Sequence, residues 1–262
     1  ANELTEICGI LNGTTNYILT RMIRAGLTFD AALKEAQQNG YAEADPTADI
    51  EGHDACRKIC ILASLAFGRH IYPRQVPTEG ITGVTLADVG YADACGRKIK
   101  LLGRAIRRDD GRVCAYVAPH LVDGENPLAG VEDVFNAITV KGDAIGDVMF
   151  YGRGAGKLPT ASAVVADVMD AAKHLNTRKY LDWGPGGDDV TVSPDGLESG
   201  WYVRARVDAE EVRRRFPEAG FLARPGATAD ETAFLTGSMT RAALDGKLSG
   251  VEVLSAFRML EE

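Results

Sequence analysis

The sequence predicts an α+β protein in which helices pack on a mixed, largely antiparallel sheet. Helical spacing of apolar residues dominates up to about residue 95. Alternating apolar and polar residues then flank two turn signals between residues 98 and 151, the pattern typical of hairpins. Because strands and helices do not alternate throughout the chain, this order favours α+β over a doubly wound parallel sheet.

The first segment, residues 3–25, is predicted to form one helix because its apolar residues keep helical spacing. Gly9 and Gly13 interrupt that propensity and favour close packing against another element. A second helix is predicted from Thr28, a suitable N-cap, to Gln38. A helix that begins at once, without an initiator Met, suggests a chain that starts in the middle of a longer protein.

The stretch 40–58 combines five acidic residues with a basic pair. Pro46 disfavours helix around it, so the first half is predicted to be a loop. A helical pattern begins at about Glu51 and ends at Gly68.

Four charged residues of this stretch are candidates for a site. Asp54 and Lys58 lie four residues apart, on one face of the predicted helix. Glu43 and Asp49 lie on the loop that leads to that face. The spacing leaves two interpretations open: a solvated acidic surface with one ion pair, or a site where a lysine moves a proton while carboxylates hold a small polar substrate.

The middle of the chain is predicted to hold two hairpins. Their turn signals are Asp109-Asp-Gly111 and Lys141-Gly-Asp143. The predicted segments are a helix at 86–94, strands at 98–106 and 113–118, and strands at 135–140 and 148–151.

A glycine-rich turn, Gly152-Arg-Gly-Ala-Gly-Lys157, connects the last of these strands to a helix that starts near Leu158 and ends near Leu175. Glycines before a helix N-terminus allow a phosphate to approach the backbone. The turn is one residue short of a P-loop, and its third glycine comes too early for the dinucleotide fingerprint. Two interpretations of these glycines stay open: a tight strand-to-helix turn, or a contact with a cofactor.

The C-terminal part is predicted to be a separate small unit. Residues 1–180 form the first domain, the Gly/Pro-rich stretch 181–199 forms a linker, and 200–262 form the second domain. The last domain has the order βαββαβ, with strands at 201–207, 220–223, 232–236 and 251–259 and helices at 210–216 and 240–244.

Composition excludes several classes of function. With a net charge of −8 and a pI of about 5.1, the 262-residue chain offers no basic face for nucleic acid. No apolar run approaches the roughly 20 residues that a membrane span needs. The five cysteines are odd in number and contain no C-x-x-C, which predicts buried free thiols in a reducing cytoplasm.

Three strings of residues resemble the homoserine dehydrogenase family. They are Gly40-Tyr-Ala-Glu-Ala-Asp-Pro-Thr-Ala-Asp with the following Asp54 and Lys58, Gly9-Ile-Leu-Asn-Gly-Thr-Thr-Asn-Tyr-Ile-Leu19, and Tyr151-Gly-Arg-Gly-Ala-Gly-Lys-Leu-Pro-Thr-Ala161. They occur in the family's order over roughly residues 1–175. The resemblance implies reversible reduction of L-aspartate 4-semialdehyde to L-homoserine by NADPH or NADH.

The same resemblance implies roles for the four charged residues. Lys58 would be the proton donor, and the acceptor in the reverse reaction. Glu43 would bind substrate, while Asp54 and Asp49 would fix the geometry of the lysine and the substrate. No catalytic metal is expected.

The resemblance also implies that Gly152, Gly154 and Gly156 approach the nicotinamide end of NADP or NAD. Members of the family carry an N-terminal domain with the dinucleotide fingerprint, and these 262 residues contain no such fingerprint. The chain is therefore expected to be a fragment that is inactive alone, and a homodimer by analogy with the family.

Residues 200–262 resemble an ACT regulatory domain. The usual Asp-x-Pro-Gly turn after its first strand is replaced by Asp208-Ala-Glu-Glu. This departure implies that L-threonine is at most a weak effector. The alternative function is a non-catalytic, ACT-bearing dimer that senses an amino acid, which explains this domain but not the acid–lysine constellation.

Overall fold

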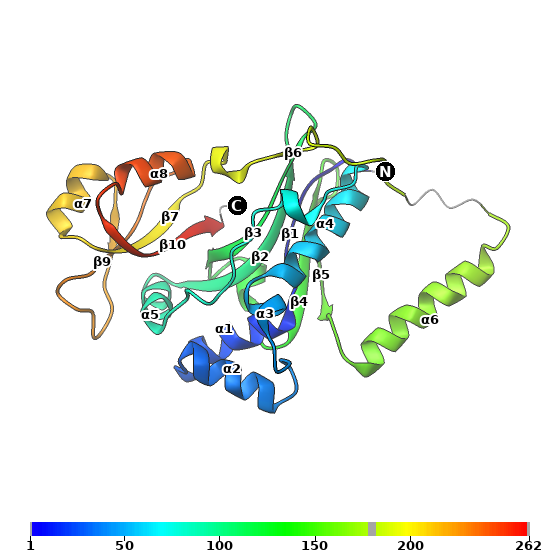
Figure 1. Cartoon of the computed structure of the whole chain (residues 1–262), viewed down its shortest axis with the longest axis horizontal. Coiled ribbons are helices and arrows are strands. Elements are labelled where there is room, and N and C mark those ends of the chain that lie inside the picture. The colour runs from blue at the N-terminus through cyan, green and yellow to red at the C-terminus, as the bar shows by residue number, and fades with distance from the viewer. Residues whose placement is uncertain (1, 178–181, 261–262) are drawn as a thin grey trace.

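The computed structural model describes residues 2–177 and 182–260, and within them one sheet runs through the molecule (Figure 1). Its strand order is β5-β4-β1-β2-β3-β10-β7-β9-β8, with β6 paired to β3. The strands are β1 (Leu4–Ile10), β2 (Arg97–Arg107), β3 (Val113–Asp123), β4 (Phe135–Gly142), β5 (Gly146–Arg153), β6 (Thr191–Val192), β7 (Trp201–Arg206), β8 (Gly220–Leu222), β9 (Thr232–Leu235) and β10 (Glu252–Leu260).

Helices pack on this sheet or flank it. They are α1 (Gly13–Ala25), α2 (Phe29–Gln38), α3 (Thr47–Ile50), α4 (His53–Phe67), α5 (Leu86–Ala94), α6 (Lys157–Lys173), α7 (Ala209–Arg215) and α8 (Arg241–Lys247). The neighbouring strands are antiparallel except where β3 meets β10 and β6. The predicted α+β class, with a mixed and largely antiparallel sheet, is confirmed.

The prediction of one helix over residues 3–25 is wrong. Residues Leu4–Ile10 form β1, and only Gly13–Ala25 are helical. β1 pairs with β2 on one side and with β4 on the other, and this long-range pairing overrides a helical spacing that exists only locally. Gly9 permits the approach of β4, because a Cβ there would lie 2.5 Å from the carbonyl oxygen of Ala137.

Most of the other local predictions are confirmed. Thr28 caps α2 by accepting a hydrogen bond from the Ala31 N–H, and both predicted hairpins form, as β2–β3 and β4–β5. The second turn begins later than predicted, because Lys141 and Gly142 still pair within β4. The loop predicted around Pro46 is partly wrong, because the next four residues form the short helix α3. A proline restricts φ to values that suit a helix start, so it begins this turn instead of preventing it.

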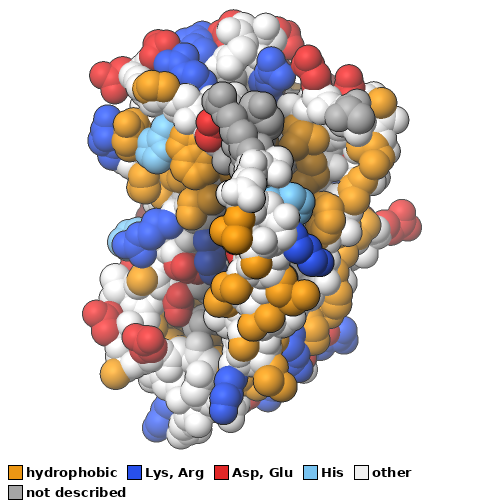
Figure 2. All heavy atoms as spheres, turned by 90° about the vertical axis from the view of Figure 1, so that its right-hand side faces the viewer, with side chains coloured by type: hydrophobic (Ala, Val, Ile, Leu, Met, Phe, Trp, Pro, Cys, Tyr) orange, Lys and Arg blue, Asp and Glu red, His pale blue; other side chains and the backbone are white. Residues whose placement is uncertain are grey.

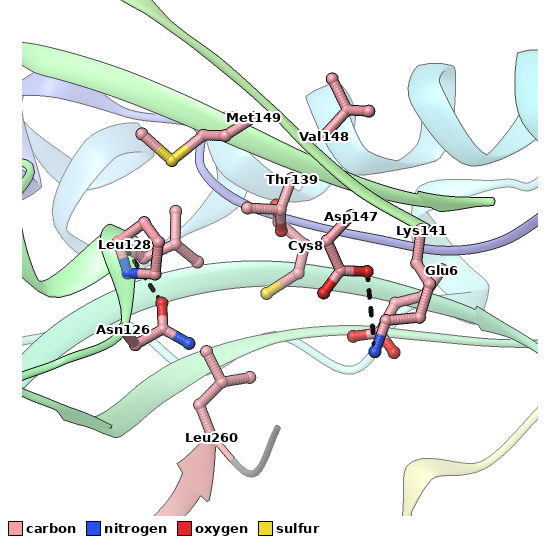
Figure 3. A pocket seen from close by; sticks show the side chains of 11 residues that line it. Glu6, Cys8, Asn126, Leu128, Thr139, Lys141, Asp147, Val148, Met149 and Leu260 are labelled. Atoms are coloured by element: carbon pink, nitrogen blue, oxygen red, sulfur yellow. Dashed lines mark hydrogen bonds and ion pairs between the residues drawn. The ribbon is translucent and has the colours of Figure 1, made fainter. Parts of the chain in front are cut away.

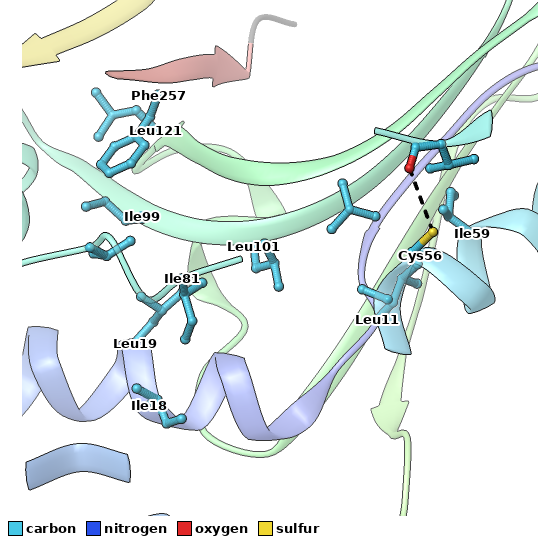
Figure 4. Close-up of a cluster of buried hydrophobic side chains, with 14 of the residues drawn as sticks. Leu11, Ile18, Leu19, Cys56, Ile59, Ile81, Ile99, Leu101, Leu121 and Phe257 are labelled. Atoms are coloured by element: carbon cyan, nitrogen blue, oxygen red, sulfur yellow. Dashed lines mark hydrogen bonds between the residues drawn. The ribbon is translucent and has the colours of Figure 1, made fainter. Parts of the chain in front are cut away.

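The main core lies between the sheet and helices α1, α4 and α5 (Figure 4). Ile18 and Leu19 of α1, Ile59 of α4 and Ile99 of β2 have no exposed surface. Burial of one such side chain contributes about 1.5–3 kcal/mol relative to exposure. This packing fixes α1 and α4 on the same face of the sheet, which positions their N-terminal ends.

The C-terminal elements follow the predicted order βαββαβ. Their strands lie in the order β10-β7-β9-β8, which is the arrangement of a ferredoxin-like unit. This unit is continuous with the first one, because Arg258–Leu260 of β10 pair in parallel with His120–Val122 of β3.

The described part of the predicted linker packs against the first unit. The Gly184 N–H donates to the Gly68 carbonyl, and its carbonyl accepts from the His70 N–H. Strand β6 pairs with the first two residues of β3. The predicted boundary at 180/181 lies outside the described residues.

A buried ionic network joins α5 to the C-terminal unit. Asp88 of α5 has no exposed surface and accepts hydrogen bonds from Arg204 Nε at 2.8 Å and from the Tyr202 hydroxyl at 2.9 Å. Arg204 also donates to Glu231 at 3.2 Å, and Glu231 accepts from the Tyr91 hydroxyl at 3.0 Å. Each charge of this network has a partner of opposite sign, which offsets the cost of its burial.

Helix α6 stands apart from the sheet, and none of its side chains is buried. It carries apolar residues on its surface, including Leu158, Val168 and Met169, each more than half exposed. Figure 2 shows apolar side chains gathered on the face of the molecule that contains this helix.

Among the residues that the structure describes, no helix combines the length and apolar character that crossing a membrane requires.

Candidate active site

A cavity of about 430 Å³ lies where the start of α1, the α3–α4 segment and the β5–α6 turn meet. Its walls come from segments far apart in the chain, which the sheet and the main core bring together. The lining residues are Asn12, Gly13, Thr14, Gly40, Tyr41, Asp49, Asp54, Lys58, Val134, Asn136, Arg153, Gly154, Ala155 and Gly156.

One wall holds the predicted acid–lysine pair. Lys58 Nζ lies 2.7 Å from Asp54 Oδ2, one turn earlier on α4, and donates to the carbonyl oxygen of Leu11 at 2.9 Å. An ammonium group has three N–H donors. Two are used by these contacts, and the third has no partner within the described residues, so it is available to a ligand in the cavity.

Asn12 links the two aspartates of this wall, and sequence reasoning missed it. Its Nδ2 donates to Asp49 Oδ1 at 2.7 Å and to Asp54 Oδ2 at 2.9 Å. Its Oδ1 accepts from the Thr15 N–H at 2.9 Å and so caps α1. The run Asn12-Gly-Thr-Thr15 is an N-cap signal that could have located this helix start.

Glu43 is not among the residues that line the cavity. It is exposed on the loop after α2, where its backbone carbonyl accepts a hydrogen bond from Gln37 Nε2 at 3.1 Å. Its role in substrate binding therefore stays a prediction.

The glycine-rich turn forms another part of the cavity lining. Gly154 and Gly156 line the cavity, whereas Gly152 pairs with Asn136 in the β4–β5 ladder and does not. Gly156 has φ +116°, which residues with a side chain rarely adopt, and α6 begins immediately after it. At Gly154 and Gly156 the turn presents bare backbone to the cavity, whereas Arg153 and Ala155 add side chains to the same lining.

The segment that leads into β4 is held by buried polar groups. Asn16 Nδ2 donates to the carbonyl oxygens of Val131, Asp133 and Phe135 at 3.0–3.2 Å. Lys100, with 1% of its surface exposed, donates to Asn16 Oδ1 at 3.1 Å and to the Val131 carbonyl. Burial lowers the pKa of Lys100 to about 8. These bonds fix the third wall of the cavity.

A second cavity, of about 170 Å³, lies on the other face of β1 (Figure 3). It is lined by Glu6, Cys8 and Met149, among others, and contains the ion pair between Lys141 and Asp147 at 3.8 Å. It holds none of the predicted site residues.

All five cysteines of the chain are free, and all except Cys95 are buried.

Comparisons with known proteins agree with this fold. The chain superimposes on a crystal structure of S. aureus homoserine dehydrogenase with a TM-score of 0.83 and 37% identity, covering 100% of this chain and 66% of that one. A hyperthermophilic archaeal homoserine dehydrogenase mutant in complex with NADPH matches with a TM-score of 0.56 and 32% identity, over 68% of this chain and 50% of that chain. The fold of this chain is therefore that of the α+β part of these dehydrogenases.

Sequence comparison identifies the family. The family model for homoserine dehydrogenase matches residues 1–169. The Pseudomonas aeruginosa homoserine dehydrogenase is 45% identical over 214 residues, which is 79% of this chain and 49% of that protein. The chain belongs to the homoserine dehydrogenase family, as the sequence strings indicated, and spans about half the length of the curated relatives it matches.

Proposed function

We propose that this chain provides the substrate-binding and proton-transferring part of a homoserine dehydrogenase, which interconverts L-homoserine and L-aspartate 4-semialdehyde with NADPH or NADH. The observation that carries the proposal is one cavity lined both by Lys58, Asp54 and Asp49 and by the glycine turn. Family membership of the chain supports the reaction assigned to it.

The acidic wall suits the ammonium group of the substrate. Asp49 and Asp54 are bridged by Asn12, which holds the two carboxylates close together despite their repulsion. A cationic ligand group placed beside them would offset that repulsion. This wall would therefore orient an amino-acid substrate, and orientation supplies much of the rate of such reactions.

Lys58 would transfer the proton in this proposal. Its contacts with Asp54 and the Leu11 carbonyl direct the ammonium group, and the remaining N–H would meet the oxygen of the semialdehyde. As that oxygen gains negative charge, Lys58 donates a proton to it, and in the reverse direction it accepts the proton from the hydroxyl of homoserine.

The glycine turn suits the nicotinamide end of a dinucleotide, which supplies the hydride when bound. Gly154 and Gly156 leave the backbone open, and the exposed guanidinium of Arg153 has no ion-pair partner among the described residues. Gly152 would not touch the cofactor; it would help to position the turn through its pairing in the β4–β5 ladder. No metal is assigned to the reaction.

We also propose how this part assembles with others. The exposed apolar face of α6 would pack against a nucleotide-binding unit. The chain would form a homodimer. It would work in a reducing cytoplasm, where cysteines stay free. The ferredoxin-like unit would be ACT-like, with weak threonine binding at most, because Asp208 caps α7 where the usual turn is absent.

Glu43→Gln should chiefly weaken substrate binding in a full-length enzyme that contains residues 1–262. The substitution removes a negative charge that would face the substrate's ammonium group, so KM for homoserine should rise more than kcat falls. Steady-state kinetics at varied homoserine measures both. An unchanged KM with a lower kcat would instead assign Glu43 to proton transfer.

The proposal is tested by what residues 1–262 do alone. The dinucleotide fingerprint, which supplies most cofactor contacts, is absent from these residues. NADPH titrated by fluorescence should therefore bind more weakly than micromolar, and NADPH with aspartate semialdehyde should give no steady change in absorbance. Micromolar binding or steady turnover would mean that the nucleotide site is contained in this chain.

A further inference from the structure

Asn136 carries a buried polar atom that the protein leaves without a partner. It lies near the start of β4 and lines the cavity. Its Oδ1 is shielded from solvent and accepts no hydrogen bond within the described residues. Buried side-chain oxygens without a partner are uncommon in folded proteins, because each one costs the free energy of desolvation without recovering a hydrogen bond.

Two glycines surround this amide and explain why no protein group reaches it. A Cβ at Gly154 would lie 2.5 Å from Asn136 Nδ2, and a Cβ at Gly13 would lie 3.4 Å from Oδ1. Both neighbours thus offer bare backbone to the faces of the amide. Asn136 also lines the cavity, so a rotation of its amide group would let a ligand there supply the missing partner.

The chemistry of the amide and its neighbours limits what that ligand is. A side-chain amide presents one acceptor and one donor group in a plane, and its complement is another primary carboxamide. The pairing holds whichever way the amide is turned. Arg153 lines the same cavity, and its positive charge disfavours an ammonium group nearby.

We propose that Asn136 pairs with the carboxamide group of the nicotinamide ring and thereby sets which way the ring lies against Gly154. This inference rests on the proposed function, which places a nicotinamide cofactor at this wall. It adds a residue that determines cofactor specificity, since a ring without a carboxamide would leave the Asn136 oxygen unpaired.

The test is an NMR titration of isotope-labelled 1–262 with nicotinamide, with 3-acetylpyridine as the matched probe that lacks the N–H donors. The side-chain amide signal of Asn136 is assigned by its loss in Asn136→Leu. Nicotinamide should move this signal saturably, with affinity on the order of millimolar for so small a ligand. 3-Acetylpyridine should bind about tenfold more weakly, and Asn136→Leu should abolish the difference.

Asn126→Leu is the matched control, because this Asn lines the second cavity and should leave both titrations unchanged. Equal responses to the two probes, or no saturable response of Asn136, would overturn the inference. A parallel titration with L-homoserine separates the two proposals. If homoserine perturbs Lys58 while nicotinamide leaves Asn136 unchanged, only the Asn136 assignment fails; if neither ligand perturbs the cavity, the proposed function fails too.

Discussion

Replacing Lys58 by Ala should lower turnover by about 10²–10⁴-fold in a full-length enzyme that contains this chain, the usual effect of losing a general acid. Lys58 is the only lysine among the residues that line the cavity, and its contacts with Asp54 and Leu11 aim it there. Alanine is the best helix former, so α4 should persist. Initial rates at saturating substrate measure the loss, and circular dichroism checks the fold.

Lys34→Ala is the matched control for Lys58→Ala. Lys34 is an exposed lysine on another helix, α2, and lies outside the cavity. Its replacement should leave the rate unchanged. A Lys58→Ala enzyme that keeps more than about half of the wild-type turnover would contradict the assignment of Lys58 as the proton donor.

Replacing Asp88 by Ala should destabilise the chain by about 3–5 kcal/mol, because the buried guanidinium of Arg204 loses its closest carboxylate. Glu231 remains near Arg204 but is already shared with Arg224 and Tyr91. The same substitution removes the Asp88 half of the capping box at Thr85, the start of α5. The midpoint of urea-induced unfolding measures the change.

Asp110→Ala provides the comparison for Asp88→Ala. Asp110 pairs with Arg112 in an exposed turn, where such pairs contribute little. The unfolding midpoint should stay the same for this variant. An Asp88→Ala midpoint equally close to the wild type would show that the network does not hold α5 to the C-terminal unit.

Local chemistry explains which elements could be predicted from the sequence. The hairpins were predictable because Asp109-Asp-Gly111 and Lys141-Gly-Asp143 are turn signals within a few residues of the strands they join. β1 was not, because its state depends on distant pairing, as of Glu6 with Ile106 in β2 and of Ile7 with Val140 in β4. Residues that satisfy a helical pattern locally can therefore form a central strand.

The same distinction applies to the site. The contact between Asp54 and Lys58 follows from their spacing on one helix, so the sequence was enough to predict it. Asn12 follows β1 as the N-cap of α1 and Asn136 lies near the start of β4, so their place in the cavity depends on the sheet. Periodicity carries no signal for such residues, although the N-cap pattern at Asn12 was readable.

The most direct test of the central claim is whether L-homoserine binds beside Lys58 in residues 1–262. The measurement is an NMR titration of protein labelled with ¹³C-lysine, in which the ε-methylene signal of Lys58 is assigned by its loss in Lys58→Arg. We predict a saturable shift of this signal with L-homoserine that is weakened in Asp49→Asn, because the acidic wall holds the ligand's ammonium group. An unchanged Lys58 signal, with threonine or homoserine instead perturbing residues 200–262, would contradict the account and favour an amino-acid sensor.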